Sequence, residues 1–424
     1  MFDLVSLGEA MQAIESGMRV YVHGTAATPH TLLQGFADRS RELRDLRLIH
    51  MHLEGPAPWL EPACQGHVRD ISLFVGPNAR KAVQSGQASY IPLFLSDAPW
   101  FLAQPENRPH VVLLNVSPPD RHGYVSLGPA LEAVLTAINH ANLIIAQVNP
   151  LVPRVLGDAA IPAERIGLGV SVEEPLSTLP EEPVDEAMRR IGELVADLVP
   201  DRATLQIGIG KVPDAVLASL QGHKDLGVHS EMISDGVRHL ALQGVVTGIY
   251  KGTDPGKIVG TFALGTQALY DFIADNPEVA LRSVDYTNDT AVIRRNPRMV
   301  SVNSAVEVDL TGQVAAEAIG TRVVSGVGGQ MDFVRGASLA EDGRSIIALP
   351  ARTRTGEPRI VATLRPGAAV TTTRNHVQYV VTEYGVAELK GGTIEERARR
   401  MIRIAHPDDR EALERAAREL IVGM

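Results

Sequence analysis

Short apolar runs alternate with segments of mixed polarity through the first part of the chain. The apolar runs predict strands at 19–24, 46–53, 111–116 and 143–148, and the segments between them predict helices at 28–37, 79–84 and 131–140. The run at 111–116 is apolar almost without interruption, which is typical of a central strand buried on both faces. This alternation of strands and helices indicates a mostly parallel sheet with helices on both faces.

The same pattern returns after a segment of different composition. Residues 173–183 are rich in Glu, Pro, Ser and Thr, and we interpret them as a linker. Strands are then predicted to begin at Leu205 and to span 226–229, 258–262, 279–283, 299–308, 345–349 and 379–382. Helices are predicted at 184–198, from Pro213, and at 237–243, 267–274, 393–403 and 408–421. We therefore expect two α/β domains, 1–180 and 181–424.

A single carboxylate stands at a position where α/β proteins bind ligands. Glu231 follows the predicted strand 226–229, and Asp235 and Gly236 begin the next predicted helix. An acidic residue at the carboxyl end of a strand lies in the crevice that such sheets use for ligands. The local sequence alone favours the interpretation of Glu231 as a solvated loop carboxylate or a helix-capping residue.

The charge and the cysteine content of the chain limit the binding partners and the cellular location that we expect. The chain of 424 residues has 40 basic and 50 acidic side chains, a net charge of −10 that does not favour nucleic acid or an anionic membrane. A local basic pocket for a phosphorylated ligand remains compatible with this balance. The single cysteine, Cys64, excludes a disulfide within the chain and favours a cytoplasmic location. No apolar run approaches 18 residues and no signal peptide is expected, so we predict no membrane association.

Two familiar kinds of site are not supported by the sequence. His50 and His52 share one face of a predicted strand, as two metal ligands would, but no further cluster of ligands follows, and we expect no metal. Gly208-x-Gly210 is followed by Pro213 where a dinucleotide fingerprint requires glycine, and no phosphate-binding G-x-x-x-x-G-K-[ST] motif is present. What remains are two glycine loops, 208–212 and 325–330, which are either ordinary turns or places where backbone N–H groups approach a ligand.

Several stretches taken together identify a family. They are GIGKVPDAVL (208–217), HSEMISDG (229–236), GKIVGTFALGTQALYDF (256–272), VDYTND (284–289), NSAVEVDLTGQV (303–314), SGVGGQMDFVRGA (325–337), VTEYGVAELKG (381–391) and IAHPDDRE (404–411). The first half adds VSPPDRHGYVSLG (116–128) and AQVNP (146–150). The chain resembles the acetyl-CoA hydrolase/transferase family over nearly its whole length, in particular the 4-hydroxybutyrate and butyrate:acetate CoA-transferase branch.

The resemblance implies a fold and a set of site residues. The fold is two CoA-transferase-type (NagB/RpiA-like) open-sheet α/β domains. The glutamate that carries acyl and CoA groups in the family falls on Glu231, and Asn288 falls where a side-chain amide orients the glutamyl group. The CoA-contacting loop falls on Gly208, Ile209, Gly210, Lys211 and Val212, with Gly328 as a further contact. Gly328 and Gly329 suit an oxyanion hole, because a backbone without Cβ lets an N–H donor approach closely.

The expected activity is an acyl-CoA:carboxylate CoA-transferase that acts on short-chain acids through a glutamyl-CoA thioester. CoA is then a substrate, with no permanently bound cofactor, and the family suggests a homo-oligomer, either a dimer or a tetramer. An ordinary carboxylate pKa is expected to suffice for Glu231. Lys211 and Arg335 are candidates for the CoA phosphates, with solvated surface charges as the alternative. The rival functions are an acyl-CoA hydrolase on the same fold and a CoA-binding module without catalysis.

Overall fold

The computed structural model describes residues 2–181 and 183–421, which fall into two compact units. The first unit comprises Met1–Pro180, Val259–Thr287 and Val324–Gly328, and the second comprises Glu181–Ile258, Asn288–Val323 and Gly329–Met424. The chain thus leaves the first unit after Pro180 and returns to it twice. Glu182 of the predicted linker lies outside the described residues, and the domains 1–180 and 181–424 stay a prediction.

The first unit is built on an eight-stranded sheet in which all neighbouring strands are parallel. In spatial order the strands are β1 (Asp3–Leu4), β10 (Leu168–Ser171), β8 (Leu143–Val148), β6 (Val111–Val116), β2 (Arg19–Val22), β3 (Leu46–His50), β4 (Val68–Ser72) and β5 (Ala88–Tyr90). Every residue of β6 is buried, as its unbroken apolar run predicts. The parallel α/β sheet expected from the sequence is confirmed.

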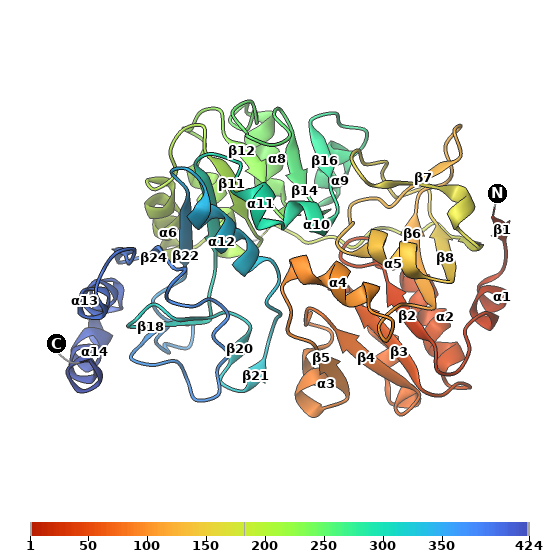
Figure 1. Cartoon of the computed structure of the whole chain (residues 1–424), viewed down its shortest axis with the longest axis horizontal. Coiled ribbons are helices and arrows are strands. Elements are labelled where there is room, and N and C mark those ends of the chain that lie inside the picture. The colour runs from red at the N-terminus through yellow and green to blue at the C-terminus, as the bar shows by residue number, and fades with distance from the viewer. Residues whose placement is uncertain (1, 182, 422–424) are drawn as a thin grey trace. The chain divides into compact units, whose positions relative to one another are not determined.

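Helices and shorter strands complete the first unit. The helices are α1 (Leu7–Gln12), α2 (His30–Ser40), α3 (Arg80–Ser85), α4 (Ala98–Ala103), α5 (Val134–His140), α9 (Gln267–Ile273) and α10 (Val284–Thr287), with single 3₁₀ turns at Pro58–Leu60, Pro62–Cys64, Leu95–Asp97 and Ala163–Arg165. The short strands are β7 (Tyr124–Ser126), β9 (Ala160–Pro162), β15 (Phe262–Ala263) and β16 (Val279–Leu281). Helix α2 lies beside β2 in Figure 1, and α1 lies next to α2. Leu32 and Phe36 of α2 share a core with Val20 and Val22.

In the second unit six strands lie in the order β12 (Gly227–His229), β11 (Thr204–Ile207), β17 (Met299–Asn303), β22 (Arg344–Ala348), β24 (Tyr379–Thr382) and β25 (Gly385–Glu388). These pairs are parallel except the terminal hairpin β24–β25. The helices are α6 (Glu186–Ala196), α7 (Lys211–Ser219), α8 (Asp235–Leu242), α11 (Thr290–Ile293), α12 (Gln330–Leu339), α13 (Ile394–Ile404) and α14 (Pro407–Leu420). Short strands are β13 (Met232–Ile233), β18 (Glu307–Asp309), β19 (Val314–Ala315), β20 (Ala318–Ile319), β21 (Arg322–Val323) and β23 (Ile360–Val361). Strand β14 (Ile258–Gly260) begins with the last residue of a second-unit segment and continues into the first unit.

Two local predictions need correction, and one helix was not predicted. The single strand predicted at 299–308 is wrong, because β17 and β18 belong to different sheets and β18 pairs with β19 and β23. The helix predicted from 131 begins only at Val134, since Glu132 has a positive φ of 40°. Helix α12 was not predicted, because buried polar residues, Gln330 and Asp332, stand where an amphipathic helix would carry apolar ones.

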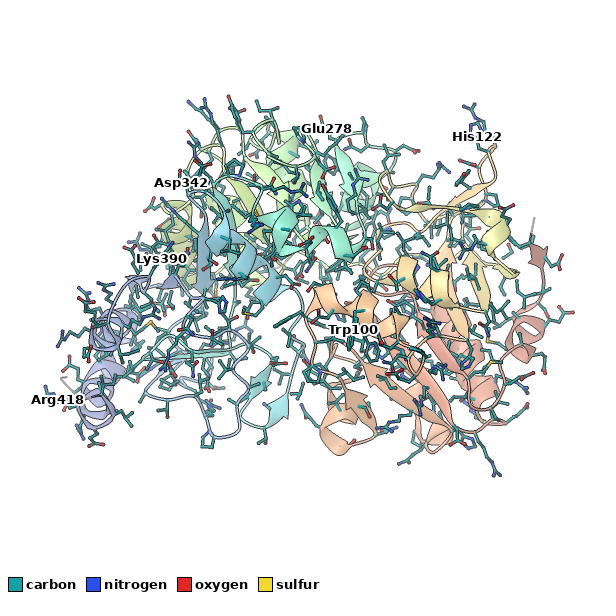
Figure 2. The ribbon with its side chains drawn as sticks, in the orientation of Figure 1. Trp100, His122, Glu278, Asp342, Lys390 and Arg418 are labelled. Atoms are coloured by element: carbon teal, nitrogen blue, oxygen red, sulfur yellow. The ribbon has the colours of Figure 1, made fainter. Side chains whose placement is uncertain are left out.

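The C-terminal helices of the second unit pack on an apolar core, and their outer surface is charged. Thr393 and Glu396 form a capping box at the start of α13. Met401 and Ile402 of α13 pack with Val380 and Leu389 beneath them. Figure 2 shows Arg418 at the outer edge of this region. Among the described residues, no helix is both long and apolar enough to span a membrane.

Candidate functional site

Glu231 follows β12, one strand away from the point between β11 and β17 where the strand order of the second unit reverses. The chain proceeds from β11 to β12 on one side and later places β17 on the other side of β11. Such a reversal opens a crevice at the carboxyl ends of the strands. The Ser230 hydroxyl donates to the carbonyl of Ile207 at 3.1 Å and accepts the N–H of Met232 at 3.3 Å. These contacts tie the turn that carries Glu231 to the end of β11.

Three residues of the second unit surround the Glu231 carboxyl. They are Asn288, which precedes α11, Gly329, which precedes α12, and Asp332 in the first turn of α12. The Asn288 side chain is fully buried, and its Nδ2 donates to Oδ2 of Asp332 at 3.0 Å. The Asn288 amide and the Gly329 N–H act on the Glu231 carboxyl as donors. The buried Oε2 of Glu231 makes no well-aligned hydrogen bond with any described residue, so these donors approach the carboxyl without saturating it.

The environment of Glu231 raises its pKa to about 7. Burial is the main cause, because it disfavours the charged form, and the negative charge of Asp332 adds to it. Hydrogen bonds from Asn288 and Gly329 lower the pKa by a smaller amount. The expectation of an ordinary carboxylate pKa is therefore wrong, and near neutral pH the free protein holds Glu231 in both protonation states.

Gly329 lies so close to Glu231 that a side chain cannot be accommodated. A Cβ built on Gly329 would lie 2.0 Å from Oε2 of Glu231 and 2.4 Å from Nδ2 of Asn288. The Gly329 backbone has φ −90° and ψ 6°, which other residues also adopt. The requirement for glycine here is therefore close approach and not backbone conformation.

The second predicted oxyanion donor, Gly328, lies with the first unit. Its φ is +59°, and its carbonyl accepts the N–H of Leu95 at 3.0 Å. A Cβ on Gly328 would lie 3.2 Å from the Phe74 ring, and one on Gly326 would lie 2.7 Å from it. Within the second unit, the structure brings Gly329 and Asn288, out of the predicted residues, to Glu231.

The predicted CoA-contacting loop is an open turn at the end of β11. Gly208 and Ile209 link β11 to α7, and Ile209 is exposed. Gly210 precedes α7 with a positive φ of 106°, and a Cβ on Gly208 or Gly210 would meet no atom within 4 Å. Lys211 and Val212 begin α7. A helix N-terminus beside an open glycine turn can receive an anionic group.

Two polar features of this site were missed by the sequence reasoning. One is Asp332, although it stands in the quoted motif 325–337, three residues after Gly329. The other is a pair of side-chain amides at the ends of β11 and β17. Gln206 donates to Asn303 at 3.3 Å and Asn303 donates back to Gln206 at 3.1 Å, which joins the strands on either side of the crevice.

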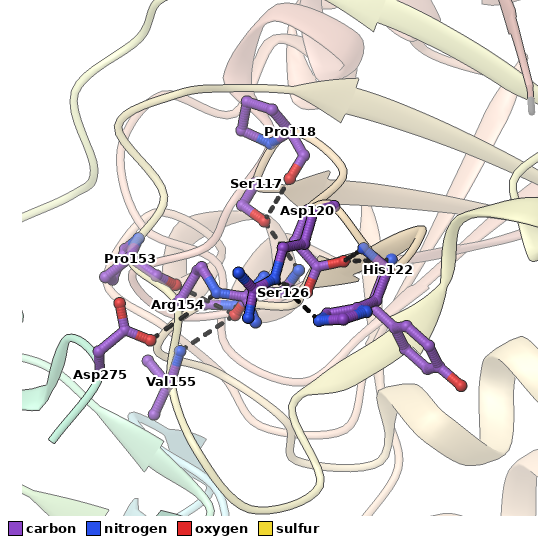
Figure 3. A network of polar contacts seen from close by, with 12 residues as sticks. Ser117, Pro118, Asp120, His122, Ser126, Pro153, Arg154, Val155 and Asp275 are labelled. Atoms are coloured by element: carbon purple, nitrogen blue, oxygen red, sulfur yellow. Dashed lines mark hydrogen bonds and ion pairs between the residues drawn. The ribbon is translucent and has the colours of Figure 1, made fainter. Parts of the chain in front are cut away.

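The motif 116–128 forms a loop of the first unit whose polar groups satisfy one another (Figure 3). Oδ1 of Asp120 accepts the N–H groups of His122 and Tyr124 at 2.9 Å each, and its other oxygen pairs with Arg154 at 3.1 Å. The Ser126 hydroxyl donates to Pro153 and accepts the N–H of Val155. These contacts explain the motif as a rigid connection.

The two histidines of the H-x-H pattern have separate partners. His50 is buried and bonds Asp70 through Nε2 at 2.9 Å. Burial lowers the pKa of His50, but the charge and hydrogen bond of Asp70 outweigh this and leave the pKa above its usual value. His52 lies 3.3 Å from Glu54, and burial lowers the pKa of His52 to about 4. The described residues contain no group of three or more His, Cys, Asp or Glu side chains that could hold a metal.

Comparisons with known proteins agree along nearly the whole chain. Residues 3–189 match the acetyl-CoA hydrolase/transferase N-terminal domain, and residues 265–417 match the C-terminal domain. The succinyl-CoA:acetate/propanoyl-CoA:succinate CoA transferase of Fasciola hepatica is 45% identical over 96% of this chain and 86% of that protein. The 4-hydroxybutyrate coenzyme A transferase of Clostridium kluyveri is 45% identical over 97% of this chain and 96% of that protein.

Solved structures agree with these relatives. The crystal structure of RipA from Yersinia pestis has a TM-score of 0.92 and 35% identity, and covers 98% of this chain and 97% of that one. The acetyl-CoA hydrolase of Eremothecium gossypii is a more distant match, 29% identical over 68% of this chain and 61% of that protein. The family resemblance and the fold class drawn from the sequence motifs are confirmed.

The raised pKa of Glu231 predicts a pH-dependent cost in stability. The folded pKa of about 7 exceeds the ordinary value of 4.5, so the contribution of this group is most favourable below pH 4.5 and is lost as pH rises through 7. Well above pH 7 the loss approaches roughly 3 kcal/mol. Glu231→Gln lacks this loss, so we expect the stability of the variant relative to the parent to increase from pH 5 to pH 8.

Urea unfolding of both proteins at the two pH values measures this difference. Glu278→Gln, which changes an exposed acid (Figure 2), serves as the control and should show the same difference at both values. A Glu231→Gln difference that does not change between pH 5 and pH 8 would contradict the raised pKa.

Proposed function

Because the chain belongs to the acetyl-CoA hydrolase/transferase family, we propose that it is an acyl-CoA:carboxylate CoA-transferase for short-chain acids such as 4-hydroxybutyrate, butyrate or acetate. The observation that carries the proposal is the Glu231 carboxyl, whose Oε2 is buried and which is faced by the Asn288 amide and the Gly329 N–H. A carboxylate supplied with hydrogen-bond donors is the arrangement that acyl transfer through a covalent intermediate requires.

The first half-reaction forms two successive covalent species. Ionised Glu231 attacks the thioester carbonyl of acyl-CoA, and a mixed anhydride forms as CoA thiolate leaves. The thiolate then attacks the glutamyl carbonyl of the anhydride, which releases the first acid and leaves a glutamyl-CoA thioester. A second carboxylate reverses these steps and departs as the new acyl-CoA, and Glu231 is regenerated.

The donors beside Glu231 act on the glutamyl carbonyl. Each attack on that carbonyl places negative charge on its oxygen. The Asn288 amide and the Gly329 N–H are held beside the carboxyl and can stabilise this charge without reorganisation. The pKa of about 7 makes Glu231 a stronger nucleophile once ionised, at the cost of a fraction that is protonated at neutral pH.

The CoA moiety requires local positive charge, since the chain is acidic as a whole. We propose that the Gly208–Val212 turn and the N-terminus of α7 receive part of CoA, with Lys211 and the exposed Arg335 of α12 near its phosphates. Gly328 remains a proposed contact of CoA and an oxyanion donor. CoA is a substrate in this scheme, and no permanently bound cofactor or metal is invoked. A cytoplasmic location and a homo-oligomeric state remain predictions.

A hydrolase on the same fold is the alternative function. The two activities differ in whether water or a carboxylate resolves the glutamyl intermediate. Release of free CoA from acyl-CoA in the absence of an acceptor acid measures hydrolysis directly. We expect transfer to exceed hydrolysis in a panel of acetyl-, butyryl-, 4-hydroxybutyryl- and succinyl-CoA with the matching free acids.

The covalent intermediate should be trapped on Glu231. Acyl-CoA supplied without acceptor should accumulate the glutamyl-CoA thioester, and borohydride should then reduce it and inactivate the protein, while CoA-free protein is spared. Initial rates at several fixed acid concentrations should give parallel double-reciprocal lines, because two half-reactions share the intermediate. Mass spectrometry should place the reduced residue at 231.

Glu231→Ala is the matched variant and should lose transfer while remaining folded. Modification of another carboxylate would overturn the assignment. Glu307, which pairs with Arg365 at 3.2 Å, and Glu317, which accepts from Thr371, are the buried carboxylates to check.

Gly329→Ala should reduce kcat/KM by roughly 100-fold or more, the cost of losing one oxyanion donor. Alanine can adopt the backbone conformation of Gly329, so the fold should stay intact. The added methyl group should instead displace Glu231 or Asn288. Gly222→Ala is the control, because a Cβ there meets no atom within 4 Å. Transfer kinetics beside thermal unfolding test this, and a Gly329→Ala protein with more than a tenth of parental activity would refute the close approach.

Charge removal at the proposed phosphate contacts should act on one substrate only. Lys211→Ala and Arg335→Ala should each raise KM for acyl-CoA about tenfold, in line with the loss of one charge-assisted contact, and should leave KM for the free acid unchanged. Lys390→Ala, at an exposed lysine of the same unit (Figure 2), is the control. Equal KM values for acyl-CoA in parent and variants would dismiss these contacts.

A further inference from the structure

Asp332 contacts the donor to Glu231 and has no place in the transfer scheme above. Its side chain is 5% exposed and accepts the Asn288 Nδ2 at 3.0 Å. A buried carboxylate is costly unless it is hydrogen-bonded, so its retention beside a second buried carboxyl requires an explanation. The contact with Asn288 supplies one.

We propose that Asp332 is a positioning residue, which holds the Asn288 side chain with its NH₂ group, and not its carbonyl oxygen, toward the Glu231 carboxyl. An asparagine amide offers two N–H donors on one side and one acceptor oxygen on the other. Because Asp332 is an acceptor, the NH₂ group must face it. The second N–H of the same nitrogen then serves Glu231. This inference rests on the proposed transfer reaction and adds a residue to it.

The orientation matters most after Glu231 has been acylated. A reversed amide would place its carbonyl oxygen against the glutamyl carbonyl, where negative charge develops during each attack. Two like partial charges would then meet in a buried site. Asp332 prevents this reversal, since the reversed amide would also direct its oxygen at the Asp332 carboxylate.

The charge of Asp332 has a second effect, on ionisation. The titratable side chains on the elements around Glu231 in the second unit are His229 on β12, Asp235, Arg238 and His239 on α8, Asp289 before α11, and Asp332 and Arg335 on α12. Asp235 is paired with Arg238 at 3.1 Å. Of these groups, Asp332 is the one whose charge raises the pKa of Glu231. Removal of the charge should therefore ease ionisation of Glu231, even as it frees the Asn288 amide.

Asp332→Asn separates these effects. The midpoint of the kcat/KM profile should move to lower pH by about one unit, and kcat on the alkaline plateau should fall about tenfold. Asp332→Glu keeps the charge and should keep the parental midpoint, and Asp332→Ser gives the same test of charge should the asparagine variant fold poorly. Asp309→Asn is the matched control: this buried aspartate of the same unit accepts from Thr311 and Gln313, and its loss should lower stability without moving the midpoint.

A second measurement needs no activity. In the parent, Glu231→Gln is expected to change the free energy of unfolding by different amounts at pH 5 and pH 8. The gap between these two amounts should be smaller when Asp332→Asn is also present. An unchanged plateau kcat in Asp332→Asn would overturn the positioning role of Asp332. An unchanged midpoint together with an unchanged stability difference would overturn its effect on the ionisation of Glu231. Retention of transfer by Glu231→Gln would instead overturn the proposed function, so the two failures are distinguishable.

Discussion

The site depends on one unfavourable arrangement, a carboxyl group buried beside a second negative charge. Glu231 is destabilised as an anion by burial and by Asp332, and is supported by donors from Asn288 and Gly329 that do not fully compensate. An unfavourable electrostatic environment of this kind lowers the stability of a folded protein, and it is found mainly at functional sites. Three features hold these groups in place. They are the hydrogen bond from Ser230 to the end of β11, the close approach of Gly329 and the first turn of α12.

The site is assembled from distant segments of the chain. Glu231, Asn288 and Asp332 come from three separate stretches of the second unit. The parallel strands β12, β11 and β17 supply the rigid frame, and the Gln206–Asn303 amide pair joins two of them at their carboxyl ends. The reacting groups thus lie on turns, and the strands form the rigid frame that positions them.

The sequence predicted those elements whose local pattern agrees with their environment. The bounds of β6, β8 and β24 were predicted without error, because continuous apolar runs lie in buried strands. Helix α12 escaped prediction since Gln330 and Asp332 are polar and buried. The family motifs named Glu231, Asn288 and Gly329, but the pKa of Glu231 depends on burial and on a charge 101 positions along the chain, which no local pattern reveals.

Gly329 and Asp332 stand three residues apart at the start of one helix, so the backbone donor and the buried acceptor are parts of a single rigid turn. A rotation of α12 would move both groups together relative to Glu231 and Asn288. The site therefore has few independent degrees of freedom. Helix-wide adjustments, such as repacking Phe333 or Val334 in the core, should be tolerated far less well than their distance from the reacting atoms suggests.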